Sequence, residues 1–275
     1  TGIMHGAAIG VTPDDSYLLY GRRDGSIAKH ELSNISRTSL GAEVGTYTGP
    51  VRAAEILFSG DSRRAYLVAE DGRLIFLDIE TMTQEGDAVQ FTRVPGSTQR
   101  RLRNTFADAS PDGRFAVVNS GGGEVSVIDL ESRSVKILQT PGLRSTQGVV
   151  FNHATNREPH LAVHGMTRVS VFEFDGLADL VLVASASVPP QAPGALYTDW
   201  QLERLGSLAW TASGDGLVAA IGGYHEFRFL ALAEGSDLRK LLDFDACGIE
   251  NRPEWLDHQL DVVTLNGKLR PPPTP

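Results

Sequence analysis

The chain has 275 residues, of which 41% are hydrophobic and 21% charged, a composition that supports a buried core and excludes a disordered chain. Its formal net charge of −9 and pI near 5.3 argue against sequence-independent nucleic-acid binding, although a local arginine patch leaves such binding open. Because the chain has no signal-peptide pattern and no run of about eighteen apolar residues, we expect a soluble protein without a membrane span.

The only cysteine, Cys247, cannot form an internal disulfide, which excludes a small disulfide-stapled scaffold. This fits the cytoplasm, which we favour, or a large periplasmic domain. Residue 1 is Thr, which indicates either a processed end or a boundary inside a longer protein.

Along the chain, one pattern recurs in blocks of about 45 to 55 residues, a spacing typical of propellers or solenoids. Each block has an apolar strand, a turn rich in Ser, Gly, Asp or Pro, and a second strand. A tight hairpin turn and a third strand follow. The blocks are a weak one from Val11, two clear ones at Tyr47–Thr81 and Arg101–Ser132, and weak ones from Phe151 and Trp210. Short strands without helical periodicity predict an all-β fold.

The two clear blocks share their turns and the end of their third strand. Their first turns are SGDS and SPDG, and their hairpin turns are the DG of Asp71-Gly72 and the GGG of Gly121–Gly123. Glycine supplies the positive φ that tight hairpins require. Their third strands end in an apolar-acid-apolar signature, LDI at Leu77–Ile79 and IDL at Ile128–Leu130.

The segment YTGPVRAAEILFSGD followed by DGRLIFLDIET resembles the WD40 repeat, and SPDGRFAVV resembles the turn of its bacterial members. The resemblance extends to about Asp245, with YVTN-type propellers as near relatives. It implies a β-propeller of four-stranded antiparallel blades around a central channel. The family's Gly-His is at best Gly45-Thr46-Tyr47 here, and its tryptophan is replaced by Leu77, Ile128, Phe172 or His30. We therefore expect apolar packing to hold the blades together.

We expect a propeller over residues 1–246 and an irregular tail over 247–275. The tail holds one strand-like run, Leu260–Leu265, so a sixth blade that is incomplete or composite stays open, with the tail completing it or docking a partner. The five expected blades lie near residues 4–46, 47–93, 100–140, 145–188 and 204–246.

The sequence contains no nucleophile elbow, P-loop, dinucleotide fingerprint, zinc-protease motif or EF-hand, so we predict no catalytic residue, metal or cofactor. The glycines at 121–123 are interpreted as a hairpin turn rather than a phosphate cradle. His160 and His164 are expected on a strand, where four residues span roughly 13 Å and cannot share a metal. We expect His30 and Trp210 to pack in the core.

Aligning the blocks on their first turns places three arginines, one histidine and one serine at the start of the first strand. The resemblance places this position at the mouth of the channel, together with the hairpin turns after the second strands. A cationic ring there would attract an anionic partner. The set comprises His5, Arg52, Arg103, Ser145 and Arg204, with Arg22, Arg23, Glu70, Asn119, Met166, Tyr224 and His225 in the turns and Arg101 and Arg144 nearby; Trp200 in a long loop is a separate anchor candidate.

The alternative for these arginines is an ordinary solvated rim, paired with acids of neighbouring blades such as Glu55 or Glu203. The leading functional hypothesis is a non-catalytic interaction or sensing platform, fused to or assembled with an effector. Two rivals stay open: a lactonase-like propeller enzyme, which needs acids converging at the channel mouth, and a structural subunit of an assembly.

Overall fold

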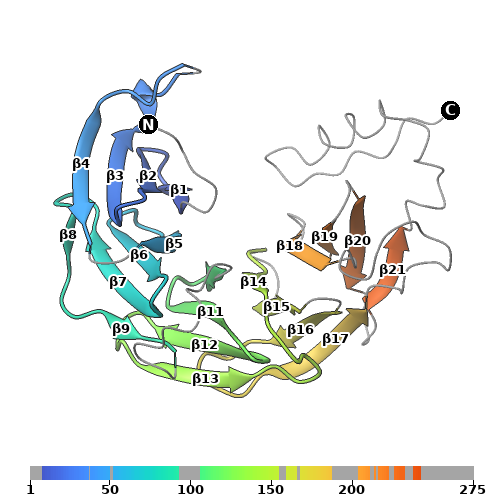
Figure 1. Ribbon diagram of the computed structural model, residues 1–275. Coiled ribbons are helices and arrows are strands. Elements are labelled where there is room, and N and C mark those ends of the chain that lie inside the picture. Colours follow the sequence, from blue (N-terminus) through green and yellow to red (C-terminus); the bar gives the residue numbers. More distant parts are fainter. Residues whose placement is uncertain are drawn as a thin grey trace, which may run out of the picture. The chain divides into compact units, whose positions relative to one another are not determined.

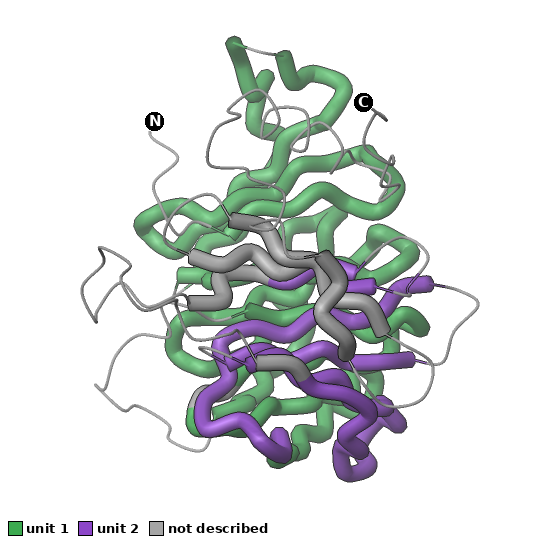
Figure 2. The backbone as a smooth tube through the Cα atoms, turned by 90° about the vertical axis from the view of Figure 1, so that its right-hand side faces the viewer, with its two compact units in different colours: residues 1–139 green, residues 140–275 purple. Residues whose placement is uncertain are grey.

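The computed structural model describes residues 8–36, 38–49, 52–92, 106–154, 159–165, 168–187, 204–210, 214, 216–222, 226–232 and 238–242. These residues form antiparallel sheets joined by short turns, with one 3-10 turn at Leu32–Asn34. The chain divides into two compact units, residues 1–139 and 140–275 (Figure 2), and each unit is described by itself. Among the described residues, no helix has the length and apolar character that crossing a membrane requires.

The described residues of unit 1 form three sheets, in which consecutive strands pair as neighbours except that β9 pairs with β7 (Figure 1). Sheet 1 consists of β1 (Ile9–Val11), β2 (Tyr17–Gly21), β3 (Ser26–Glu31) and β4 (Glu43–Thr48). Sheet 2 consists of β5 (Ala53–Phe58), β6 (Arg64–Ala69), β7 (Arg73–Asp78), β8 (Thr83–Gln84) and β9 (Val89–Gln90). Sheet 3 consists of β10 (Ala107–Ala109), β11 (Phe115–Gly121), β12 (Glu124–Asp129) and β13 (Val135–Gln139).

The described residues of unit 2 form two further four-stranded sheets with the same order. Sheet 4 consists of β14 (Gly148–Phe151), β15 (His160–His164), β16 (Arg168–Glu173) and β17 (Val181–Ser187). Sheet 5 consists of β18 (Arg204–Trp210), β19 (Gly216–Gly222), β20 (Glu226–Leu232) and β21 (Leu238–Leu242). The all-β architecture of four-stranded antiparallel sheets is thus confirmed.

Sheet 2 departs from the four-stranded plan. Its outer position is divided between β8 and β9, which pair with opposite ends of β7. The expected block from Tyr47 also differs from the sheet, because Tyr47 lies in β4 and pairs with Ile27 of sheet 1. The sequence repeat therefore begins in the outer strand of the preceding sheet.

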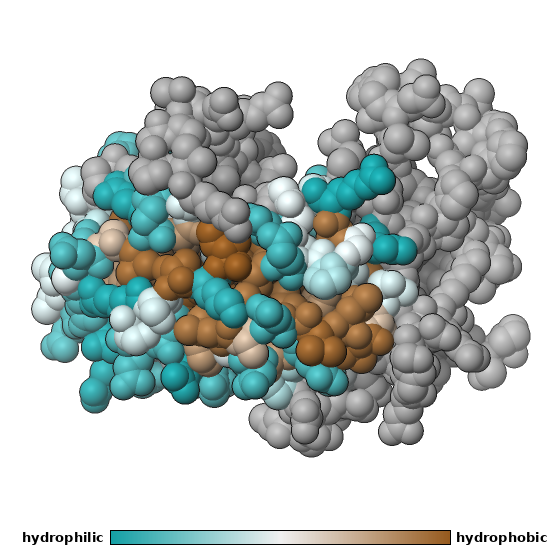
Figure 3. All heavy atoms as spheres, turned by 90° about the horizontal axis from the view of Figure 1, so that it is seen from below, coloured by the Kyte–Doolittle hydropathy of each residue, from teal (hydrophilic) through white to brown (hydrophobic). Residues whose placement is uncertain are grey.

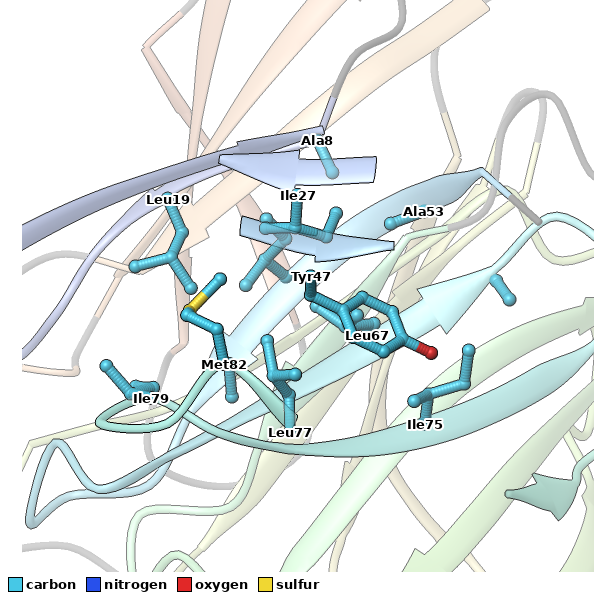
Figure 4. Close-up of a cluster of buried hydrophobic side chains, with 13 residues drawn as sticks. Ala8, Leu19, Ile27, Tyr47, Ala53, Leu67, Ile75, Leu77, Ile79 and Met82 are labelled. Carbon is cyan, nitrogen blue, oxygen red and sulfur yellow. The ribbon is translucent and has the colours of Figure 1, made fainter. Parts of the chain in front are cut away.

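Apolar residues fill the space between sheets 1 and 2 (Figure 4). Leu19 and Ile27 of sheet 1 meet Leu67, Ile75 and further buried residues of sheet 2. Between sheets 2 and 3, a second cluster includes buried side chains from both, and in unit 2 a third joins sheets 4 and 5. This bears out the expectation that apolar packing holds the sheets together.

Side-chain donors reinforce this packing by reaching backbone carbonyls of the adjacent sheet. The buried Lys29 donates from its Nζ to the Ile79 carbonyl at 2.7 Å and to the Glu80 carbonyl at 3.3 Å. In unit 2, Trp210 donates from its Nε1 to the Val150 carbonyl at 3.2 Å and packs against the apolar cluster, as expected.

The acid of the apolar-acid-apolar signature caps the turn after the third strand. Asp78 accepts hydrogen bonds from the amide and hydroxyl of Thr81, both at 2.7 Å. Asp129 accepts from the amides of Glu131 and Ser132, at 3.0 and 2.8 Å. These bonds lower the pKa of both aspartates, Asp78 through Thr81 and Asp129 through Ser132 first, because they favour the charged carboxylate.

Candidate functional site

The start of each first strand lies beside the end of the second strand of the same sheet. We call this end of a sheet its entry edge; it is the end where the first strand starts and the second strand finishes, and it differs from the open side of an outer strand. A backbone hydrogen bond of 2.7 to 3.1 Å recurs there: Gly21 to Ala8, Glu70 to Arg52, Asn119 to Phe106 and Gln147 to His164. Strand starts and hairpin turns therefore share one edge within each of these four sheets, as the sequence alignment requires.

Arg52 lies at the entry edge of sheet 2, directly before β5. Its guanidinium is 3.7 Å from the carboxylate of Glu70, which follows β6 in the same sheet. Both side chains are largely buried, with 29% and 12% exposed. Arg52 and Glu70 lie at one edge, and they pair within sheet 2 and not with an acid of a neighbouring sheet.

Arg22 and Arg23 occupy the entry-edge turn between β2 and β3 of sheet 1. Arg22 forms an ion pair with Glu43 of β4, and its guanidinium carbon lies 5.6 Å from the centre of the Tyr20 ring. The hydrogen bond to Glu43, and then Tyr20, raise the pKa of Arg22. Arg23 is exposed, and no ion pair holds it among the described residues.

In unit 2, Arg144 is exposed in the loop before β14, and Ser145 beside it is partly exposed. Arg144 likewise has no ion pair in the part of the chain that the structure describes. Arg204 is the first residue of β18, where its backbone pairs with Gly222. His5, Arg101, Arg103, Met166, Trp200, Glu203, Tyr224 and His225 lie outside the described residues, so their placement in the predicted ring stays a prediction.

A β-bulge makes Arg52 and Arg204 equivalent. The register shifts between Ala53 and Glu55 in β5, and likewise between Leu205 and Ser207 in β18. The described register of β1 and β10 has no such shift. An alignment without gaps does not account for an extra residue inside a strand. It therefore offsets the strand-start positions of sheets 2 and 5 by one residue relative to those of sheets 1 and 3.

The structure also brings together two acids that sequence reasoning did not pair. Glu55 on β5 is largely buried, and Asp108 lies on β10 of the adjacent sheet. Loss of water by burial, and then the negative charge of Asp108, raise the pKa of the Glu55 carboxyl from 4.5 to about 7. The only signal for Glu55 in the sequence is that it is a charged residue inside an otherwise apolar strand, AAEILF.

The histidines behave as structural residues where they are described. His160 and His164 lie on β15, as expected, and Nδ1 of His164 is 3.1 Å from the Gly165 carbonyl. Burial lowers the pKa of His164. His30 is buried and stacks on Tyr20, in agreement with a packing role. Among the described residues, no three His, Cys, Asp or Glu side chains gather closely enough to hold a metal ion.

Glycines 121–123 form the predicted hairpin between β11 and β12. Gly122 and Gly123 have φ of 64° and 76°, the left-handed conformation that glycine adopts without steric cost. Because they join two strands and precede no helix, they do not form a helix-based phosphate site.

No protein-family model and no curated protein matches the chain. Among solved structures, the chain is similar to the β-propeller domain of Cps50 (Swd1) from Myceliophteria thermophila, at 12% identity and a TM-score of 0.50, with 88% of this chain and 87% of that chain covered. It is also similar to a chain of the mitotic checkpoint complex, at 14% identity and a TM-score of 0.62; there 85% of this chain corresponds to 64% of that one. The bacterial part of the resemblance stays a prediction, and the chain has the β-propeller fold that the WD40 resemblance implies.

Proposed function

We propose that the chain is a non-catalytic platform that binds a protein partner at the entry edges of its sheets, as part of a larger protein or complex. The observation that carries this proposal is the exposure of Arg23 and Arg144 at two entry edges, without an acidic partner among the described residues. A guanidinium whose donors are free can bind a carboxylate or phosphate bidentately.

The surrounding charge favours an anionic partner. The chain carries a net charge of −9. Such a protein attracts anions only at places where exposed cationic side chains create a local positive potential. Arg22 and Arg52 already hold carboxylates of their own sheets and contribute less free positive charge than Arg23 and Arg144. The recognition chemistry is thus that of an acidic or phosphorylated protein segment.

The test is affinity capture from the native host with the purified chain and with Arg23→Glu and Arg144→Glu as separate variants. The matched control is Arg63→Glu, because Arg63 is an exposed arginine in the β5–β6 turn, at the other edge of sheet 2. We expect a protein that the wild type and Arg63→Glu capture and that the entry-edge variants lose. Equal capture by all four proteins would refute the entry-edge site.

One observation favours a second candidate function. The raised pKa of Glu55 beside Asp108 is the kind of environment that prepares a carboxyl group for proton transfer near neutral pH. A lactonase-like hydrolase also needs acids that hold a cation. Hydrolysis of simple lactones that Glu55→Gln abolishes, together with no protein captured by the wild type, would favour this enzyme.

A further inference from the structure

The outer strand of sheet 4 differs from the other outer strands described. β17 has the sequence VLVASAS, seven residues without a charge or a proline. Each of the others is interrupted or charged: Glu43 begins β4, Lys136 lies in β13, Arg239 and Lys240 lie in β21, and β8 and β9 have two residues each. Natural sheets usually protect their edges by such charges and short strands, because an open edge invites pairing with another chain.

The edge of β17 is unpaired among the described residues. Sheet 4 ends at this strand, which pairs only with β16. Backbone N–H and C=O groups along the outer side of an end strand point away from their own sheet, so they remain able to bond another strand.

Two large apolar side chains stand exposed at the start of this edge. Val181 is 56% exposed and Leu182 is 45% exposed, the former being the largest exposure among the large hydrophobic residues described. Val181 and Leu182 pair in regular register with Glu173 and Phe172. A register shift follows at Val183, which packs against the apolar cluster of unit 2.

Figure 3 shows hydrophobic side chains exposed among hydrophilic ones on one face of the described residues. The charges at the start of β17 are acidic. Glu173 pairs with Val181 across the two strands and is exposed, and Asp175 follows it in an exposed turn. A segment that adds to this edge therefore fits best with basic residues at the end that meets Glu173.

We propose that β17 is a strand-addition site for an extended segment of another protein, with alternating apolar residues and a Lys or Arg at the end beside Glu173. Backbone hydrogen bonds along β17 supply most of the attachment, an apolar side chain covers Val181 and Leu182, and the basic residue pairs with Glu173 or Asp175. This site is separate from the entry edges and does not depend on the function proposed for them.

The probe is a fluorescent synthetic peptide of alternating Val and Thr with a Lys at each end, titrated against the whole chain and followed by anisotropy. Two comparison peptides differ in one feature each: one has a central Pro, which removes a backbone donor, and one has Glu in place of both Lys residues. We expect saturable binding of the Lys peptide and about tenfold weaker binding of either comparison peptide.

The protein variants locate the binding. Leu182→Lys places a charge on the edge, and its matched control is Val44→Lys, since Val44 is 42% exposed on the outer strand of sheet 1. We expect Leu182→Lys to weaken binding of the Lys peptide about tenfold and Val44→Lys to leave it unchanged. Glu173→Lys should reverse the preference toward the Glu peptide. Circular dichroism confirms that each variant folds.

Three outcomes would overturn the proposal. The wild type could fail to bind any of the peptides, or Leu182→Lys and wild type could bind the Lys peptide equally. The third is self-association of the wild type in sedimentation that Leu182→Lys abolishes, which would assign the edge to a second copy of this chain.

Discussion

Replacing Glu55 with Gln should stabilise the protein, and by an amount that depends on pH. In the folded state, burial and Asp108 raise the pKa of Glu55 from 4.5 to about 7. A shift of this size corresponds to about 3 kcal/mol between the folded and unfolded states. The folded protein retains a proton that the unfolded chain releases, so the free energy of unfolding falls as pH rises from 4.5 to about 7.

Glutamine keeps the shape of the side chain and removes its titration. The stability difference between Glu55→Gln and wild type should be small at about pH 4.5, grow through about pH 6 and level off at up to about 3 kcal/mol above about pH 7. Urea unfolding followed by tryptophan fluorescence at three pH values measures this difference. The variant Asp108→Asn should reduce the pH dependence in the wild-type background, because it removes the second cause of the shift.

A stability difference that stays constant from about pH 4.5 to 8 would refute the reasoning. It would mean that Glu55 titrates alike in the folded and unfolded chains, so neither burial nor Asp108 acts on it as described.

Three further predictions concern the contribution of single residues to stability. Lys29→Met should lower the free energy of unfolding by about 1 to 3 kcal/mol in chemical denaturation, because the buried Ile79 carbonyl loses its donor; an unchanged midpoint would contradict this. Gly72→Ala should destabilise by at least about 1 kcal/mol in the same assay, since Gly72 has φ of 86° and an added Cβ would lie 2.3 Å from the Thr92 hydroxyl. Trp210→Phe should cost about 1 kcal/mol through its lost hydrogen bond, and thermal unfolding with the wild-type midpoint would count against that bond.

The local pattern of the chain predicted most of the fold. Asp71-Gly72 and the glycines at 121–123 predicted tight hairpins. The strands between the turns are apolar, so they predicted that each sheet packs against another sheet. These signals act within about ten residues, where turn chemistry and side-chain alternation determine the backbone. The all-β architecture and the repeated strand order followed from them.

The candidate site was less predictable, because it depends on contacts and on single insertions that a one-dimensional pattern does not contain. The bulge beside Ala54 moves Arg52 by one residue relative to an ungapped count, and Glu70 neutralises part of its charge through a contact within the sheet. Glu55 and Asp108 come from two different sheets, so their proximity could not be predicted from any spacing in the sequence.

Four of the hydrogen bonds between neighbouring sheets share a directional property. In each of the four, a side chain of one sheet donates to a main-chain carbonyl of an adjacent sheet: Lys29 to Ile79, Ser126 to Phe91, Arg133 to Asp87, and Asn152 to Gly214. A main-chain acceptor is present whatever amino acid occupies its position, so each bond restricts the identity of one residue instead of two. Neighbouring repeats can therefore change their sequences independently while the sheets remain attached, which accounts physically for a propeller fold whose repeats resemble one another so little.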